Sequence, residues 1–463
     1  MDPTSLQQLA QWAHASLSCA DAARTVTRVC TDTRGLEAGD LFVALRGEHF
    51  DGHHFVSAAA AAGAAAALVD TAFEGETPAG FALLRVEDTL RALQEIAASY
   101  RASLPLRVLA LTGSTGKTST KDFTAAVLSE RFRVVKTEGN FNNHIGLPLT
   151  MLRASAADEI GIFEIGMNHP GEIAPLAALA APDAAIITNI GSAHIEFLGS
   201  RAGIAQEKGL LAEALPASGF LVLNDRDEFS DAIAARTRAG VVRSGIGRGE
   251  LSATLLASGM DGSRFRVRAG EEEAEVILPV PGLHMIENAL LALAAGRAFG
   301  VSLADGARGL SSSRLTHGRL ERKTLGGIHF LDDSYNANPD SMRAALRTLA
   351  VLPVTGARIA VLGRMGELGR ESETGHRSVG RDAADAGVDL LIAVGGAEAG
   401  QLAEAARQGG LKNVHHVADP AAAAALLAEN AHPGDLVLLK GSRAARMERV
   451  LEHPAFLSPS AAS

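Results

Sequence analysis

Cysteine, aromatic residues and basic charge are all scarce in this chain of 463 residues. Its two cysteines, Cys19 and Cys30, are too few for a disulfide framework, so we expect a reducing compartment. Aromatic side chains make up 4%, which leaves the cores to alanine, leucine, valine and isoleucine. The net charge of −10 argues against a long contact with nucleic acid, because surfaces that neutralise many phosphates are normally basic.

Long apolar runs are also missing. The sequence holds no uninterrupted apolar stretch of about 18 residues, so we expect no membrane span. No basic segment followed by an apolar one stands at the N-terminus, so we expect no signal peptide and a cytoplasmic location. A content of 47% hydrophobic and 21% charged residues is typical of globular proteins and excludes a disordered chain, a collagen and a coiled coil.

The length predicts about three domains, because a domain averages about 150 residues. The first, residues 1–104, alternates short apolar runs with polar turns and ends near Pro105, which disfavours helix at the residue before it. The second, residues 105–317, contains buried strands and helices, followed by shorter alternating strands over 251–280. The third, residues 318–463, alternates strand-like runs with helical stretches, which favours a parallel sheet covered by helices.

Three local patterns give further structural expectations. The alanine-rich run at 58–67 predicts a helix of small residues packed closely on a sheet. A helix is expected from His284 to Phe299, ending at Gly300, because glycine often ends helices. The C-terminal LSPSAAS, residues 457–463, predicts disorder.

The segment TGSTGKT at 112–118 predicts a phosphate-binding loop (P-loop). An apolar strand precedes it and an amphipathic helix follows, so glycine N–H groups and a helix N-terminus can surround phosphates. Lys117 can reach the outer phosphates of a nucleotide and Thr118 can bind Mg²⁺. The loop is a shortened variant of GxxxxGK[ST], because Leu111 stands where the first glycine is expected.

Polar residues also follow other strand-like runs. Glu164 ends an apolar strand, where a carboxylate faces the ligand crevice of a parallel sheet, and Mg²⁺ prefers oxygen ligands. His194 follows another such strand and is expected near metal or phosphate. The loop at 331–342, LDDSYNANPDSM, favours ligand contact, although turn formation alone can explain its residues. Lys208 lies on an amphipathic helix, and from the bare sequence it is expected to be a solvated surface lysine.

Together these segments resemble the Mur ligases, ATP-dependent amide-forming enzymes of peptidoglycan precursor synthesis. The resemblance covers nearly the whole chain and rests on TDTRGLEAGDLFVALRGEHFDGHHF (31–55), TEGNFNNHIGLPL (137–149), FEIGMNHPGEI (163–173), DDSYNANPDSM (332–342) and KGSRAARMERV (440–450). DSYNANP is the most diagnostic and implies the activity that joins D-alanyl-D-alanine to a UDP-N-acetylmuramoyl-tripeptide through an acyl phosphate. The implied fold is α/β with three domains: a UDP-sugar-binding N-terminal domain, a central P-loop NTPase-like domain that binds ATP, and a C-terminal Rossmann-like domain that binds the incoming dipeptide.

The resemblance also implies cofactors and residue roles. The cofactors are ATP and Mg²⁺, with two ions expected, and Lys208 would be carbamylated, which reverses its interpretation as a surface lysine. The catalytic residues would be Lys117, Glu164, His194 and Lys208. The metal ligands would be Thr118, Glu164, His194 and Lys208. The nucleotide would be bound by Gly113, Ser114, Thr115, Gly116, Lys117, Thr118, Asn288, Arg319 and Asp333. The other substrates would contact Asp32, Arg34, Gly47, Asn140, Asn142, Asn143, Tyr335, Asn336 and Asn338.

Two residues depart from the family pattern. Met285 replaces an asparagine in GLHMIEN (282–288), so adenine binding would rely more on Asn288 and on apolar packing. Arg364 stands in GRMGELG (363–369) where an acid is usual, which puts a metal or polar role there in doubt.

With the ligase activity we expect a monomer. Three alternative functions stay open. A sister Mur-type ligase would add a single amino acid. A P-loop NTPase acting as a switch would hydrolyse nucleotide with a protein partner alone, whereas a ligase would need both small substrates. A sugar-nucleotide-binding module without catalysis would leave the P-loop unexplained.

Overall fold

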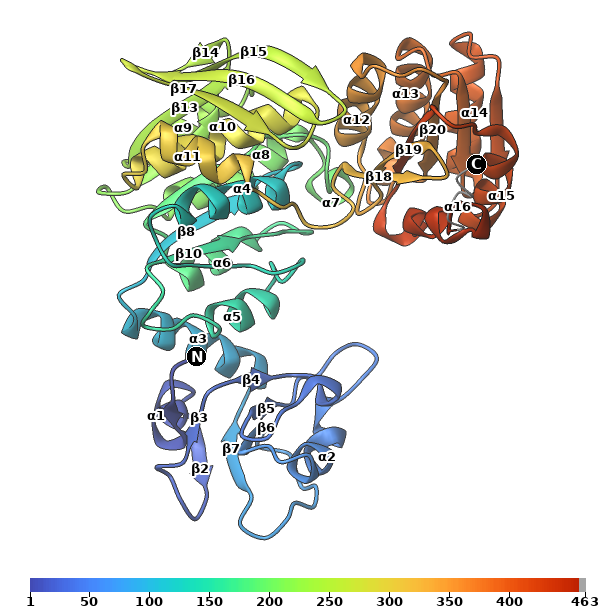
Figure 1. Cartoon of the computed structure of the whole chain (residues 1–463). Helices are drawn as coiled ribbons and strands as arrows, with labels where there is room; N and C mark the ends of the chain where they lie inside the picture. Colours follow the sequence, from blue (N-terminus) through green and yellow to red (C-terminus); the bar gives the residue numbers. More distant parts are fainter. Residues whose placement is uncertain (458–463) are drawn as a thin grey trace.

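Three large β-sheets, each covered by helices, make up the computed structural model, which describes residues 1–457 (Figure 1). The expected α/β class is therefore confirmed. The expectation of a disordered tail concerns residues 457–463. Leu457 is the last residue of α16, and residues 458–463 lie outside the described part. The sheets fall within the three predicted domain ranges, and we keep those ranges as the first, second and third domains, with their exact boundaries still a prediction. Within residues 1–457, no helix is both long enough and apolar enough to cross a bilayer.

The first domain holds a five-stranded sheet of order β2-β7-β6-β5-β4 and a two-stranded sheet, β1-β3. The β2–β7 and β1–β3 pairs are antiparallel and the others are parallel. Its strands are β1 (Thr4–Ser5), β2 (Ser16–Ser18), β3 (Thr25–Val26), β4 (Val29–Cys30), β5 (Leu41–Val43), β6 (Ala66–Asp70) and β7 (Ala82–Val86). Its helices are α1 (Leu6–Trp12), η1 (Thr33–Gly35), η2 (Gly52–Phe55), α2 (Val56–Ala61) and α3 (Thr89–Ser103).

The alanine-rich run does not form one helix, so that prediction was wrong. The helix α2 ends at Ala61, and Gly63 adopts a left-handed φ of +94° that reverses the chain. The following alanines form β6, whose Ala66 pairs with both Leu41 and Ala82. Helix propensity is a weak preference, and here pairing in a closely packed sheet overrides it.

The second domain is built on a nine-stranded sheet of order β17-β16-β15-β13-β12-β11-β8-β10-β9. The strands from β15 through β13 to β9 are parallel, and the hairpins β15–β16–β17 are antiparallel. The strands are β8 (Arg107–Thr112), β9 (Val134–Lys136), β10 (Ile160–Glu164), β11 (Ala184–Ile187), β12 (Phe220–Asn224), β13 (Gly240–Ile246), β14 (Arg248–Gly249), β15 (Leu251–Gly259), β16 (Gly262–Ala269) and β17 (Glu272–Leu278). The helices are α4 (Lys117–Ser129), α5 (Gly146–Met151), α6 (Ile173–Ala180), α7 (Ile195–Leu198), α8 (Arg201–Glu213), α9 (Ser230–Ala234), α10 (Leu283–Ala298) and α11 (Leu303–Ser311).

The central strand β8 is buried on both faces, and its side chains alternate between two cores. Leu109 and Leu111 join the core under α4, α10 and α11, which continues into the third domain. Val108 and Ala110 join the core under α5, α6 and α8, which continues through α3 into the first domain. The second domain thus shares one core with each neighbour. The expected end of the helix near Gly300 is confirmed, since α10 stops at Ala298 and Gly300 has a φ of +91°.

The third domain has a six-stranded sheet of order β18-β19-β23-β20-β21-β22, parallel except for β18. Helices cover both faces, as a Rossmann-like domain requires. The strands are β18 (Glu321–Leu325), β19 (Ile328–Asp333), β20 (Arg358–Gly363), β21 (Leu390–Val394), β22 (Val414–Val417) and β23 (Leu436–Lys440). The helices are α12 (Pro339–Val351), η3 (Gly369–Glu371), α13 (Ser372–Asp385), α14 (Ala397–Gln408), α15 (Pro420–Asn430), η4 (Arg443–Ala445), η5 (Met447–Glu452) and α16 (Pro454–Leu457).

Candidate active site at the ends of three parallel strands

The P-loop, Glu164 and His194 follow three neighbouring parallel strands. β8 lies between β10 and β11, with Leu111 paired to Glu164 and Thr112 paired to Ile187. The carboxyl ends of parallel strands meet at one edge of a sheet, where α/β proteins bind ligands. Sheet order therefore explains why residues about 80 positions apart in the chain converge on one site.

The P-loop is shaped by backbone that only glycine adopts readily. Gly113 has a φ of +153°, and a Cβ there would lie 1.8 Å from Thr188 Oγ1. Gly116 has a φ of +77°, and a Cβ there would lie 2.5 Å from Asn288 Oδ1. Within the described residues, no side chain caps the N-terminus of α4. Its free N–H groups and positive dipole end are therefore open to an anion.

Lys117 is half-buried at this helix start, and its Nζ donates a hydrogen bond to the Gly113 carbonyl at 2.8 Å. Removal from water lowers the pKa of Lys117, and the nearby Glu164 carboxylate opposes that effect. The side chain is thus folded against the loop that is predicted to hold phosphates, where its charge is available to them.

Glu164 is the carboxylate at the centre of the site and is 2% exposed. It accepts hydrogen bonds from Thr118 Oγ1 at 3.2 Å and from Asn142 Nδ2 at 2.8 Å. Lys121 Nζ lies 3.6 Å from its Oε2. Within residues 1–457, no three His, Cys, Asp or Glu side chains are grouped to hold a metal on their own. One carboxylate and one hydroxyl beside a P-loop nevertheless fit Mg²⁺, which takes most of its ligands from nucleotide phosphates and water in such sites.

His194 has a left-handed φ of +63°, which is uncommon for a residue other than glycine. Its Nδ1 lies 2.6 Å from Oε2 of Glu367 in the third domain. The imidazole lowers the pKa of Glu367. Beside it, Asp340 of the third domain accepts hydrogen bonds from the N–H and Oγ of Ser192, both at 2.8 Å. The loop that carries His194 is therefore a contact surface for the third domain.

Lys208 is fully buried, so its interpretation as a solvated surface lysine was wrong. It lies on the same face of α8 as Ile204 and Leu211, which pack into the core beneath the helix. Burial lowers the pKa of Lys208 well below its usual value, and the charge of Lys117 adds to that effect. Among residues 1–457, its Nζ has no hydrogen-bond partner.

The chain between the second and third domains crosses the front of the P-loop helix. Arg319 Nη2 donates a hydrogen bond to Thr118 Oγ1 at 3.1 Å, and its guanidinium lies 4.2 Å from the centre of the Tyr335 ring. Asp333 is turned elsewhere, since its Oδ2 accepts a hydrogen bond from buried Lys440 at 2.6 Å. That pairing holds the end of β19 against the end of β23.

One cavity of about 320 Å³ collects most of the predicted site. The predicted residues that line it are Ser114, Thr115, Gly116, Lys117, Thr118, Asn140, Asn142, Asn143, Glu164, His194, Arg319, Tyr335, Asn336 and Asn338. Asn288 lies behind the P-loop, where its Nδ2 contacts Met285 Sδ at 3.9 Å, and Lys208 lies in the core. Gly113 and Asp333 stand at strand ends outside the lining.

Eight lining residues were not among the predicted site residues: Gly166, Met167, Asn168, Glu172, Ser341, Glu367, Lys440 and Arg443. Lys440 and Arg443 could have been predicted from the same sequence feature as Glu164, because both stand where an apolar strand-like run ends. Arg364, in the same motif as Glu367, is exposed.

The predicted sugar-nucleotide residues lie in the first domain, outside this cavity lining. Asp32 and Arg34 form an exposed ion pair at 2.5 Å, which lowers the pKa of Asp32 to about 2. Gly47 lies against the ring of Phe50, which is 59% exposed. The structure leaves Asp32, Arg34 and Gly47 open to a ligand from solution without joining them to the phosphate site.

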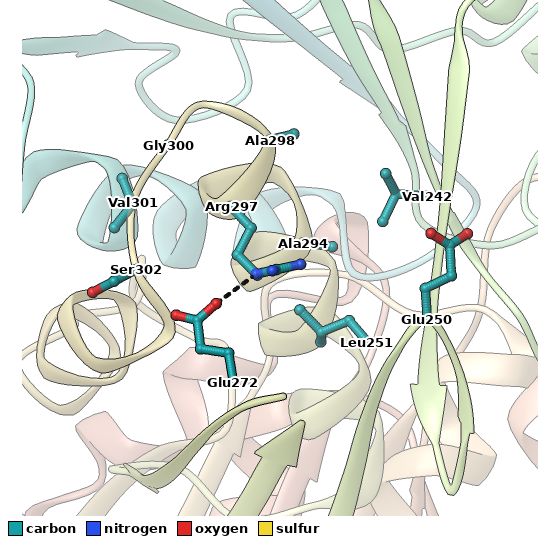
Figure 2. Close-up of a pocket in the computed structure, with 10 residues that line it drawn as sticks. All are labelled: Val242, Glu250, Leu251, Glu272, Ala294, Arg297, Ala298, Gly300, Val301 and Ser302. Atoms are coloured by element: carbon teal, nitrogen blue, oxygen red, sulfur yellow. Dashed lines mark hydrogen bonds and ion pairs between the residues drawn. The ribbon is translucent and has the colours of Figure 1, made fainter. Parts of the chain in front are cut away.

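A second cavity, of about 450 Å³, lies in the second domain between β15 and the end of α10 (Figure 2). Figure 2 shows Arg297 turned toward Glu272, and the two side chains are joined at 2.9 Å. This pairing neutralises the charge that would otherwise attract a ligand. The cavity at the strand ends, which is lined by the P-loop residues, is therefore the candidate nucleotide site.

Family profiles match most of the chain. The profile described as Mur ligase family, catalytic domain, matches residues 25–101. Mur ligase middle domain matches residues 111–296, and Mur ligase, glutamate ligase domain, matches residues 318–443.

Whole-chain relatives agree with these profiles. The chain is 40% identical to UDP-N-acetylmuramoyl-tripeptide–D-alanyl-D-alanine ligase of Bacillus subtilis (strain 168), covering 92% of each chain. It is similar to the crystal structure of MurF from Acinetobacter baumannii, with 33% identity, a TM-score of 0.88 and 98% of each chain covered. It is also similar to MurF ligase from Thermotoga maritima in complex with ADP, with 28% identity, a TM-score of 0.80, and 92% of this chain and 96% of that one covered. The predicted three-domain architecture is confirmed, and the chain belongs to the Mur ligase family.

Proposed function

We propose that this protein is an ATP-dependent ligase that joins D-alanyl-D-alanine to a UDP-N-acetylmuramoyl-tripeptide in peptidoglycan precursor synthesis. The observation that carries the proposal is the single cavity in which P-loop residues, Glu164 and polar residues of the third domain meet. This arrangement suits a reaction between a nucleotide and two further substrates. The names of the relatives from Bacillus subtilis and Acinetobacter baumannii support the same activity. An ATP-consuming reaction also favours the cytoplasm as its location.

Amide formation from a carboxylate needs activation, which ATP supplies. The terminal carboxylate of the tripeptide attacks the γ-phosphate and gives an acyl phosphate and ADP, and the amine of the dipeptide then displaces phosphate. In this scheme the P-loop N–H groups orient the triphosphate, while Lys117 and Arg319 neutralise its charge. Bound Mg²⁺ would further offset the repulsion between carboxylate and triphosphate, held by Thr118 and Glu164.

A second ion and a modified lysine belong to the same proposal. His194 and a carbamylated Lys208 would hold the second Mg²⁺ together with Glu164. Lys208 suits carbamylation because its buried amine has a strongly lowered pKa and no hydrogen-bond partner. The reaction adds CO₂ to the neutral amine and releases one proton, and it leaves an anionic carbamate in place of the neutral amine.

We further propose that the first domain binds the UDP end of the acceptor through Asp32, Arg34 and Gly47. The third domain would hold the dipeptide, with Tyr335, Asn336 and Asn338 at its edge of the cavity. Asn140, Asn142 and Asn143 would lie between acceptor and nucleotide. Asn288 would contact adenine, and Asp333 the ribose, after the domains adjust around the nucleotide. The protein would act as a monomer, because each of these groups comes from one chain.

The substrate assignment predicts a sharp result in a matrix of acceptors and amines. Phosphate release from ATP is expected only when UDP-N-acetylmuramoyl-tripeptide and D-alanyl-D-alanine are present together. A site that pairs polar groups of a dipeptide rejects a single amino acid, because its buried groups would be left unpaired. The measurement compares muramoyl mono-, di- and tripeptides against D-alanyl-D-alanine, D-alanine, L-lysine and diaminopimelate.

Omission of each substrate in turn is the control for uncoupled hydrolysis. Best turnover with a shorter acceptor and a single amino acid would move the protein to a sister activity. Steady hydrolysis that needs neither small substrate would instead favour an NTPase that acts on a protein partner.

Movement of the third domain is also expected during the reaction. At the P-loop edge its contacts with the second domain include the polar pairs Asp340 with Ser192 and Arg319 with Thr118, beside the apolar core that the two domains share. Polar contacts of this kind permit rigid-body motion. Small-angle scattering with an ATP analogue and both substrates is expected to give a more compact profile than the free protein. An unchanged profile under saturating ligands would contradict domain closure.

A further inference from the structure

The linker between the second and third domains, residues 312–320, hydrogen-bonds to the P-loop helix α4 at two points. At one point Thr118 Oγ1 accepts a hydrogen bond from Arg319 Nη2 at 3.1 Å. At the other, Asp122 Oδ2 accepts hydrogen bonds from the N–H of Thr316 at 2.9 Å and from its Oγ1 at 2.8 Å. Thr118 and Asp122 are four residues apart on a helix, so they share one face. The later helix residue, Asp122, contacts the earlier linker residue, Thr316, so the linker runs antiparallel to α4 between the two contacts.

Asp122 is built into this position. Its carboxylate is 3% exposed, and its second oxygen accepts a hydrogen bond from Lys136 Nζ at 2.6 Å. A buried carboxylate is costly unless its oxygens are paired. Here one oxygen is paired within the second domain, and the other is used entirely by the linker, 194 residues further along the chain.

The backbone turns sharply on both sides of Arg319. Gly318 has a φ of +70° and Leu320 one of +51°, both left-handed. The Gly318 carbonyl accepts a hydrogen bond from the N–H of Tyr335 at 3.2 Å, and the Tyr335 ring lies under the Arg319 guanidinium. The position of the Arg319 guanidinium therefore depends on where this turn begins. Thr316 precedes the turn and is held in place by its hydrogen bonds to Asp122.

We propose that Asp122 is a positioning residue that acts through Thr316 and places Arg319 beside the nucleotide phosphates. This inference rests on the proposed function for the role of Arg319, and it goes beyond that function in assigning Asp122. Asp122 itself lines no part of the cavity. Its effect is on where a distant guanidinium sits during phosphoryl transfer.

The first test replaces Asp122 with asparagine in the full chain. The asparagine amide has one acceptor oxygen, and the charged Lys136 ammonium is the stronger donor for it. The amide NH₂ then faces the Thr316 N–H, from which it cannot accept a hydrogen bond, so the linker contact is weakened while the side-chain volume is kept. The expected result is a fall in kcat of about 10-fold to 100-fold, the size of effect that a misplaced group causes. Thr316→Val removes one of the two linker hydrogen bonds and should give a smaller fall, whereas Thr316→Ser keeps both and should restore wild-type kcat.

Lys136→Met is the matched control. It removes the other partner of the same carboxylate and leaves the linker contact in place. It is expected to lower thermal stability, because the buried Asp122 carboxylate loses its ion-pair partner. It is expected to keep kcat within about 3-fold, because the hydrogen bonds from Thr316 to Asp122 remain. A fall in kcat as large as that of Asp122→Asn would overturn the proposal, since Asp122 would then act only through the stability of α4.

A double-mutant cycle with Arg319→Ala identifies the route of the effect. If Asp122 acts through Arg319, Asp122→Asn lowers kcat no further once Arg319 is gone. If the two substitutions instead lowered kcat by the product of their separate effects, the proposal would be overturned. Should Asp122→Asn fail to fold, Thr316→Val takes its place in the cycle, since Thr316 lies in the linker rather than in the core of α4.

Hydrogen exchange separates this inference from the proposed function. Amides of residues 312–320 are expected to exchange faster in Asp122→Asn than in the wild type, without any substrate present. Unchanged exchange would overturn the linker contact itself. Faster exchange in a protein that ligates no muramoyl peptide would support the contact between Asp122 and the linker and would contradict the proposed reaction.

Discussion

Lys117→Ala is expected to reduce ligation by at least about 100-fold to 1000-fold, the usual cost of losing a group aimed at developing charge. In the structure the Lys117 side chain bonds only to its own loop, through the Gly113 carbonyl. Little packing is lost on truncation, so the melting temperature should stay close to that of the wild type. Phosphate release with both substrates, together with a thermal melt, measures both quantities on the same sample.

Lys412→Ala provides the matched control for this loss of charge. Lys412 is an exposed lysine of the third domain. Its removal is expected to leave turnover unchanged, because surface substitutions away from a site usually have small effects. Near-normal turnover of folded Lys117→Ala would contradict the assignment of the P-loop.

Substitution of Lys208 is expected to have the second large effect. Ligation activity should fall, while the stability of the fold should stay the same or rise. Lys208→Met is expected to remove most ligation, because the anionic metal ligand cannot form. The same change replaces a buried amine that has no hydrogen-bond partner with an apolar side chain of similar length. Burying an unpaired polar group costs about 1–3 kcal/mol, so the variant should be at least as stable as the wild type when metal is absent.

Labelling shows whether the modification is present. Wild-type protein equilibrated with ¹³C-bicarbonate and Mg²⁺ is expected to show a carbamate carbon signal that Lys208→Met lacks. Lys412, which is solvated, serves as the internal comparison for non-specific labelling. Full activity of Lys208→Met, or a wild-type spectrum without the signal, would refute the role of a carbamate.

The part of the site that lies on strand ends could be predicted from the sequence. The residues of the P-loop, Glu164 and His194 each follow an apolar run, and parallel strands bring their carboxyl ends to one edge. The structure adds the strand order β11-β8-β10, which shows that the P-loop strand β8 lies between the other two. Local sequence was therefore enough to name these residues as neighbours of one ligand.

The rest depends on contacts between elements that local patterns do not specify. Lys208 lies between Ile204 and Leu211 on one helix face, and that apolar spacing was the available signal for its burial. Asp333 sits in a loop rich in ligand-like groups, yet buried Lys440 takes its carboxylate at 2.6 Å. No spacing rule links Asp122 with Thr316, because their contact exists only once the linker returns to the P-loop helix.

The scarcity of aromatic residues gives the protein a natural optical label. Its one tryptophan, Trp12, meets Tyr100 edge-on with ring centres 6.2 Å apart. The Tyr100 hydroxyl donates a hydrogen bond to the carbonyl of Ala154 in the second domain at 2.7 Å. Light absorbed by indole is therefore emitted from one place, the junction of the first and second domains. A change in that emission on adding the sugar nucleotide would follow this junction alone, independently of the third domain.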